Sequence, residues 1–151
     1  MPNTYTQLYV QVVFAVKGKA SLIQESQRIP VEKYICGIVK NQKCKPLAIY
    51  CNPDHLHLLF GIHPSISISG VVQRIKIAST KYIKSELAIS SFLWQDGYGA
   101  FSYSRKDLDR VLRYILNQRQ HHAKQHFKEE ILAIFKNHNV DYNKDYLFDF
   151  I

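Results

Sequence analysis

The feature that most constrains the fold is the order in which strand-like and helix-like segments follow one another. Residues 7–16 place apolar side chains at every second position, and residues 45–52, 55–62 and 99–104 are also predicted to be strands. Helices are predicted over residues 24–42, 65–87, 105–120 and 126–138. The first six segments, in the order strand, helix, strand, strand, helix, strand, predict an α+β fold of the ferredoxin-like (split βαβ) type.

This fold has an antiparallel sheet with two helices on one face, to which the C-terminal helices are added. We expect the opposite face to be free, as in RNA-recognition modules that bind single strands there. The sequence contains no repeat or linker, so residues 1–151 are predicted to form one domain. Within it, residues 1–120 form the core and residues 121–151 a C-terminal helix and tail.

Charge and composition restrict the class of protein. Twenty Lys and Arg against twelve Asp and Glu give a net charge of +8, which favours nucleic acid as a partner and an acidic membrane surface second. On charge alone, a basic protein without such a partner is the alternative. The sequence has no signal-peptide pattern, no apolar run of about 18 residues and no C-x-x-C pair among its three cysteines. We therefore expect a cytoplasmic protein with reduced thiols and no membrane segment.

Residues 51–60 place two histidines one residue apart in an apolar strand. Because strand side chains alternate between faces, Leu56 and Leu58 should point into the core while His55 and His57 share the other face. Their Cβ atoms would then lie about 7 Å apart. Two neutral imidazoles at this separation can bind one divalent cation if a third ligand joins them. A pair of hydrogen-bonded histidines without a metal is the alternative.

Two parts of the chain offer a third ligand. In the helix after the fourth strand, Tyr114 and Gln118 lie one turn apart on a polar flank. Gln118 can supply an oxygen ligand and Tyr114 a phenolic nucleophile. The histidine-rich stretch with His121, His122 and His126 is the alternative, although a phosphate-facing or solvated role fits these residues at least as well.

Four segments, in this order and spacing, resemble the single-tyrosine HUH transposases, which are small transposases of insertion sequences and their REP-associated relatives. The segments are PDHLHLLF, ISGVVQRIKIASTKYI, LWQDGYGAFSYS and VLRYILNQ, and the resemblance extends from residue 5 to about residue 120. In that family two histidines and a glutamine bind Mg²⁺ or Mn²⁺, and a tyrosine four residues before the glutamine is the nucleophile. These roles fall on His55, His57, Gln118 and Tyr114.

The resemblance implies a transposase that cleaves and rejoins single-stranded DNA at insertion-sequence ends through a 5′-phosphotyrosine intermediate. It also implies hairpin-bearing DNA and a homodimer. In such dimers the tyrosine helix often completes the partner's site, so action of Tyr114 in trans and action in cis are both open. Basic helix residues are expected to contact phosphates, namely Arg74, Lys81, Arg105, Arg110 and Arg113. Three aromatic residues near the fourth strand are candidates to stack on bases, with core packing as the alternative: Tyr98, Phe101 and Tyr103.

Two other functions fit parts of the sequence. A ferredoxin-like module that binds single-stranded nucleic acid without cutting it explains the charge, but not the pairing of H-x-H with Y-x-x-x-Q. A metal-dependent hydrolase using residues 121–126, with Tyr114 in a structural role, would leave no covalent protein–DNA adduct. A chain with these motifs can also be inactive or domesticated.

Overall fold

The computed structural model describes residues 3–19, 21–122 and 127–142, except for the side chains of Lys19, His121 and His122. The elements alternate in the predicted order: β1 (Tyr9–Ala15), α1 (Glu25–Asn41), β2 (Lys45–Cys51), β3 (His55–Gly61), α2 (Ile68–Glu86) and β4 (Gly99–Tyr103). Three further helices follow: α3 (Leu108–Leu116), α4 (Gln118–His122) and α5 (Phe127–Asn137). No helix in the described ranges is both long enough and apolar enough to cross a membrane.

The four strands form one antiparallel sheet in the order β2-β3-β1-β4. This is the strand order of the ferredoxin-like fold, so the predicted α+β class is confirmed. The central pair, β1 and β3, is in a register that places Val13 opposite His57 and Ala15 opposite His55. Pro46 lies in the edge strand β2. Proline has no N–H group, and it is tolerated in an edge strand because the missing N–H can be one that would face solvent.

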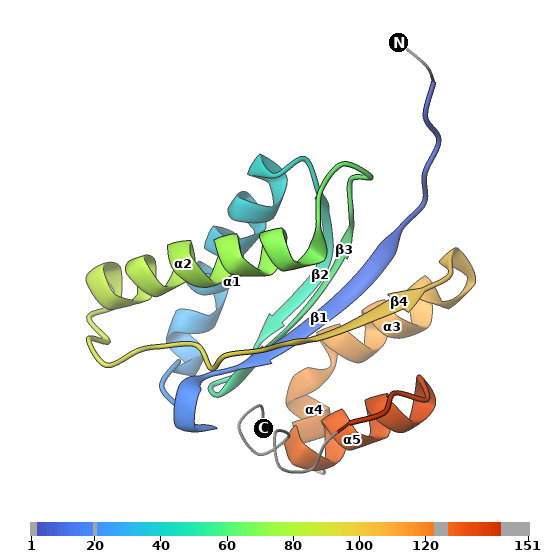
Figure 1. The fold of residues 1–151 in the computed structure, drawn as a ribbon. Helices are drawn as coiled ribbons and strands as arrows, with labels where there is room; N and C mark the ends of the chain where they lie inside the picture. Colours follow the sequence, from blue (N-terminus) through green and yellow to red (C-terminus); the bar gives the residue numbers. More distant parts are fainter. Residues whose placement is uncertain (1–2, 20, 123–126, 143–151) are drawn as a thin grey trace.

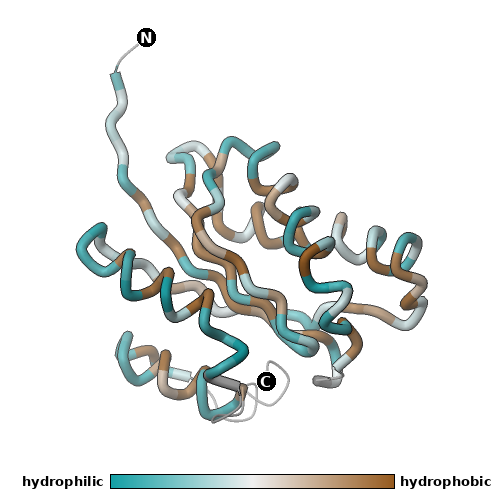
Figure 2. The backbone as a smooth tube through the Cα atoms, turned by 180° about the vertical axis from the view of Figure 1, so that it is seen from behind, coloured by the Kyte–Doolittle hydropathy of each residue, from teal (hydrophilic) through white to brown (hydrophobic). Residues whose placement is uncertain are grey.

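Helices α1 and α2 cover one face of the sheet (Figure 1). Leu56, Leu58 and Phe60 of β3 point to this side and pack in one core with Val71 and Ile75 of α2. The hydropathy view shows the apolar residues concentrated along the strands and on parts of the helices (Figure 2). The helix predicted over residues 65–87 and the predicted direction of the β3 leucines are therefore confirmed.

The opposite face of the sheet is covered in the described structure, so our expectation of a free face is wrong. Val111 and Ile115 of α3 pack on Leu59 and neighbouring residues of β2. Helix α5 covers the part of the sheet around Val13 and Phe101. The physical reason is that the second face also carries apolar side chains, among them Val13, Leu59 and Phe101, and burying them stabilises the fold.

The long connection between α2 and β4 is fixed by two polar side chains of α2. Trp94 Nε1 donates a hydrogen bond to Ser79 Oγ at 2.9 Å. Lys76 Nζ donates to the carbonyl oxygens of Gln95 and Gly97 at 2.8 and 2.7 Å. These bonds hold the segment that leads into β4, the strand that ends at the candidate site.

The single helix predicted over residues 105–120 is divided into three pieces. A 3-10 turn, η2 (Arg105–Asp107), precedes α3, and the helix breaks at Asn117 before α4 begins. Asn117 has ψ near +21°, outside the helical range, and its N–H donates to the carbonyl oxygens of Arg113 and Ile115. Tyr114 and Gln118 consequently lie on either side of a helix break.

Candidate active site and metal centre

The two histidines of β3 are completely buried on the sheet face that α3 and α5 cover. Their ring centroids lie 5.3 Å apart, so both are on one face as predicted. Phe127 of α5 stacks on His55 at 4.0 Å, and the ring of Tyr114 meets His57 edge-on at 5.9 Å. The histidine pair thus lies where β3, α3 and α5 meet.

Each imidazole is anchored through its Nδ1 atom. His55 Nδ1 lies 2.7 Å from Asp54 Oδ1, and His57 Nδ1 lies 2.8 Å from Gln11 Oε1. Gln11 is buried on β1 and donates its Nε2 to the Tyr103 hydroxyl at 2.8 Å, which leaves its oxygen to accept from His57. Histidines that bind a metal typically donate their second ring nitrogen in this way, so the arrangement leaves both Nε2 atoms as the ligating atoms.

A third candidate ligand, which the sequence analysis missed, is Glu130 of α5. Its Oε1 lies 2.5 Å from His57 Nε2 and 3.5 Å from His55 Nε2. All three side chains are buried, and their ligating atoms lie within 4.8 Å of one another, so the group could hold a metal ion. A signal was present in the sequence, because Glu130 interrupts the apolar stripe of a short helix between Phe127 and Ile131.

The carboxylates around the pair favour positive charge. Burial by itself lowers the pKa of His55, but hydrogen bonds to Asp54 and Glu130 and the charges of these two residues outweigh it, so the net pKa is raised. The same negative charge attracts a divalent cation. Two anchored imidazoles and a buried carboxylate therefore fit a divalent metal ion in both donor type and charge.

Tyr114 of α3 also reaches this group. Its hydroxyl is hydrogen-bonded to Glu130, and Gln118 Nε2 donates to the Tyr114 backbone carbonyl at 3.4 Å. Burial raises the pKa of Tyr114 far above its ordinary value, and the charge and hydrogen bond of Glu130 add to the shift, while the Gln118 side chain opposes it. The phenol is consequently neutral in this state and needs added positive charge nearby to become a good nucleophile.

Gln118 lies buried at the start of α4, beside the histidine pair. Its Oε1 accepts a hydrogen bond from Asn52 Nδ2 at 3.3 Å, and the same nitrogen lies 3.1 Å from His55 Nε2. The structure thus brings together the four residues that the sequence singled out, although metal binding by Gln118 remains a prediction. Asn52, which is not among the predicted site residues, also belongs to the site.

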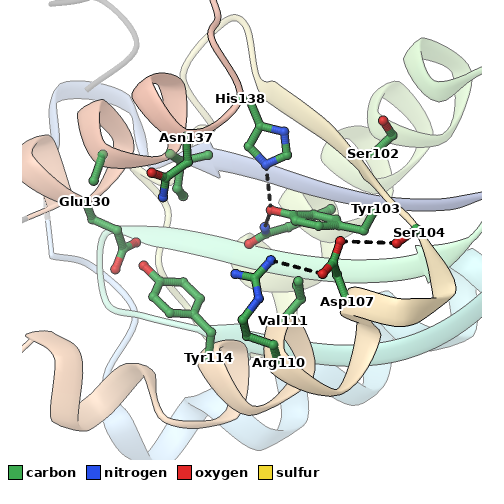
Figure 3. A pocket seen from close by; sticks show the side chains of 13 residues that line it. Ser102, Tyr103, Ser104, Asp107, Arg110, Val111, Tyr114, Glu130, Asn137 and His138 are labelled. Atoms are coloured by element: carbon green, nitrogen blue, oxygen red, sulfur yellow. Dashed lines mark hydrogen bonds and ion pairs between the residues drawn. The ribbon is translucent and has the colours of Figure 1, made fainter.

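A cavity of about 650 Å³ opens at the Tyr114 hydroxyl (Figure 3). Glu130 and Tyr114 lie at one side of it, while Tyr103 and His138 lie at the other, joined by a 3.2 Å contact between His138 Nε2 and the Tyr103 hydroxyl. Arg110 also lines it. Its volume is in the range of small-ligand sites, and it is large enough for a nucleotide.

The basic residues predicted to contact phosphate lie on two sides of the sheet. The first group belongs to η2 and α3, next to the cavity, and the second to α2, across the sheet: Arg105, Arg110 and Arg113, then Arg74 and Lys81. All five are exposed. The structure therefore brings only the first group close to Tyr114.

The three aromatic residues near β4 have different surroundings. Phe101 is buried against α5, so it is a core residue. Tyr103 lines the cavity, and Tyr98 is 37% exposed. The side chains of His121 and His122 and all of His126 lie outside the described residues, so their predicted alternative roles stay predictions.

Sequence comparison places the chain in a family. The family model described as "Transposase IS200 like" matches residues 4–118. The chain belongs to the IS200-like transposase family. The predicted resemblance to the small transposases of insertion sequences is therefore confirmed at the level of the family. A comparison with curated proteins gave no match.

Two solved structures share the fold of this transposase. A candidate transposase from Deinococcus radiodurans R1 matches with a TM-score of 0.63 and 21% identity, over 78% of this chain and 95% of that one. A REP-associated tyrosine transposase bound to a REP hairpin matches with a TM-score of 0.59 and 14% identity, over 81% and 73% of the two chains. At these identities the likeness supports the fold alone.

Proposed function

We propose that this transposase cleaves and rejoins single-stranded DNA at insertion-sequence ends through a covalent bond to Tyr114. The observation that carries the proposal is the convergence of Tyr114 from α3 and of His55 and His57 from β3 on one buried carboxylate of α5, Glu130. A tyrosine with only a structural role does not require contact with both a buried histidine and a buried carboxylate.

In the proposed step, Tyr114 Oη attacks a backbone phosphorus while the bond from phosphorus to the 3′ oxygen breaks. The phosphate stays on the 5′ end of the downstream strand as a phosphotyrosine, and the phenolic proton ends on the released 3′-hydroxyl. Attack by a second 3′-hydroxyl reverses the step and joins new ends. Because each step exchanges one phosphate ester for another, neither water nor ATP is consumed.

The residues proposed to hold the divalent cation are His55 and His57, with Gln118 as the predicted oxygen ligand. Bound there, Mg²⁺ or Mn²⁺ would supply a Lewis acid that polarises a phosphate oxygen and stabilises developing negative charge. Asp54 and Gln11 keep the two imidazoles oriented through their Nδ1 atoms. Gln118 additionally donates its Nε2 to the backbone carbonyl of Tyr114, which links the two residues across the helix break.

The surroundings of Tyr114 support a nucleic-acid strand as the substrate. The adjacent cavity can hold a nucleotide, and Arg110 beside it can neutralise a phosphate. Hairpin recognition and the homodimer are carried over from the family resemblance. Tyr114 contacts His57 of its own chain, which supports action in cis, so the trans arrangement remains a prediction of the resemblance alone.

The test is an adduct assay with labelled single-stranded hairpins from the flanks of the gene, in Mn²⁺ or Mg²⁺, run on denaturing gels. We expect label from the 3′ side of the cut to stay on the protein. Tyr114→Phe should abolish the adduct and spare binding, because phenylalanine lacks the attacking oxygen. The exposed Tyr142 provides a matched control, Tyr142→Phe, which should behave as wild type.

The same assay separates the other two functions. A binding module would retain the strand without cutting it in any metal. A hydrolase acting through residues 121–126 would cut without leaving an adduct, and Tyr114→Phe would largely spare its activity. Either result with DNA that the protein demonstrably binds would contradict the proposal.

A further inference from the structure

The histidine pair receives its nearest carboxylate from a helix outside the family match. The match ends at residue 118, whereas Glu130 lies on α5, whose helix begins at Phe127. Ile131 and Ile134 hold α5 against Val13 and neighbouring residues of the sheet, and this packing buries Glu130. The approach of Glu130 to the histidines is therefore built into the docking of α5 on the sheet. Figure 3 shows Glu130 on this helix beside Tyr114.

The spacing of the donor atoms suits ligation of one ion. Ligands bound at about 2.1 Å and at right angles lie about 3 Å from one another. The two distances from Glu130 Oε1 to the histidine Nε2 atoms, 2.5 and 3.5 Å, lie on either side of this value. The three donor atoms lie within 4.8 Å of one another, so modest shifts of Glu130 and the two histidines would gather them around one cation.

The charge of the site also favours a carboxylate such as Glu130 as a ligand. His55, His57 and Gln118 are all neutral ligands when they bind a metal, and the site is removed from water. A divalent cation transferred to such a place loses its hydration and needs an anionic ligand to offset the cost. Glu130 is the carboxylate that lies in direct contact with a histidine Nε2 atom.

We propose that Glu130 is a ligand of the divalent cation, so that binding of the metal ties α5 to the sheet. The proposal rests on the proposed function, because that function assigns the metal to His55 and His57. It gives the C-terminal region, beyond the family match, a direct part in forming the metal centre. Metal binding should then stabilise the docked position of α5, and undocking of α5 should weaken metal binding.

The first test is Mn²⁺ binding to the full chain, measured by isothermal titration calorimetry and electron paramagnetic resonance. Glu130→Gln keeps the size of the side chain but removes its charge, and it should weaken Mn²⁺ binding by about 10-fold or more. Glu129→Gln is the matched control, because Glu129 is the preceding residue of the same helix and is exposed. The control should bind Mn²⁺ as wild type does.

The second test follows amide hydrogen exchange in α5 of the wild-type protein with and without Mn²⁺. Metal should slow exchange across residues 127–137, and Glu130→Gln should remove this effect. Unchanged exchange in wild type at saturating Mn²⁺ would overturn the proposal, whether or not the variant folds. Equal Mn²⁺ affinities of Glu130→Gln and wild type would overturn it too.

These outcomes are distinct from a failure of the proposed function. A wild-type protein that binds no Mn²⁺ would refute the metal assignment and this inference together. A wild-type protein that binds Mn²⁺ and forms the Tyr114 adduct, but whose affinity is unaffected by Glu130→Gln, would refute only the role of Glu130.

Discussion

At the scale of single residues, the two imidazoles of the site are held by partners of different charge. His57 donates to the neutral amide of Gln11 on a neighbouring strand, whereas His55 lies beside the carboxylate of the residue that precedes it, Asp54. A carboxylate partner makes an imidazole a more basic ligand than an amide does. If His55 binds the proposed cation through Nε2, Asp54 should raise the metal affinity from the other side of the ring.

This argument predicts that Asp54→Asn weakens Mn²⁺ binding by about 10-fold, the lower end of the effect expected for an orienting partner. The substitution keeps the shape of the side chain and removes its charge. Calorimetric titration with Mn²⁺ measures the effect. Asp109→Asn, at an exposed position of α3, removes the same charge away from the site. Equal losses in the two variants would mean that net charge, and not orientation of His55, sets the affinity.

At the scale of elements, α5 is fixed at both ends by contacts to the sheet face it covers. Phe127 at its start stacks on His55. His138, just after its end, packs on Phe101 and contacts the hydroxyl of Tyr103. Burial lowers the pKa of His138, and the positive charge of Arg110 adds to the shift. The C-terminal end of α5 therefore binds less tightly when His138 is protonated.

The sign of this pKa shift predicts how stability changes with pH. The folded-state pKa of His138 lies below the unfolded value of about 6.5. The stabilisation that neutral His138 gives the folded protein is therefore complete above pH 6.5, and it is lost as the pH falls through the folded-state pKa. His138→Gln should remove this part of the acid destabilisation. Urea denaturation of both proteins between about pH 5 and 8 measures it.

The quantity to compare is the difference in unfolding free energy between wild type and His138→Gln. The raised pKa of His55 makes both proteins more stable as the pH falls, and this effect cancels in the difference. An unfolding free-energy difference that stays constant below pH 6.5 would contradict the assigned role of His138.

At the scale of the whole molecule, the net charge is +8, and basic residues lie on the helices of both faces of the sheet. The proposed catalytic face carries Arg110 and Arg113 on α3. The face across the sheet carries Arg74 and Lys81 on α2. A strand short enough to occupy only the surroundings of Tyr114 should therefore contact the first pair and not the second.

Salt dependence tests this difference. Each phosphate contact on a single strand contributes about 0.7 to the slope of log affinity against log salt concentration. Replacing both Arg110 and Arg113 by Gln should reduce the slope by up to about 1.4, whereas Arg74→Gln with Lys81→Gln should leave it nearly unchanged. Fluorescence anisotropy with a short labelled oligonucleotide measures both. A larger reduction from the α2 pair would place the strand on the opposite face.

Local spacing in the sequence determined the strands, the main helices and the pairing of residues within one element. His55 and His57 share a face because strand side chains alternate. The four-residue spacing of Tyr114 and Gln118 predicted that they meet, and they do so through the Gln118 Nε2 bond to the Tyr114 carbonyl although the helix breaks between them. These relations involve neighbours in the chain, so residue order is sufficient to predict them. The ferredoxin-like sheet followed from the order of the same elements.

The tertiary structure decided which helices cover the second face of the sheet, and with it the burial of the histidine pair. It also brought Glu130 to His57 across 73 positions of sequence. Such a contact depends on how α5 docks against apolar side chains of several strands at once. No local spacing encodes that docking, because the energy that selects it comes from packing over the whole chain.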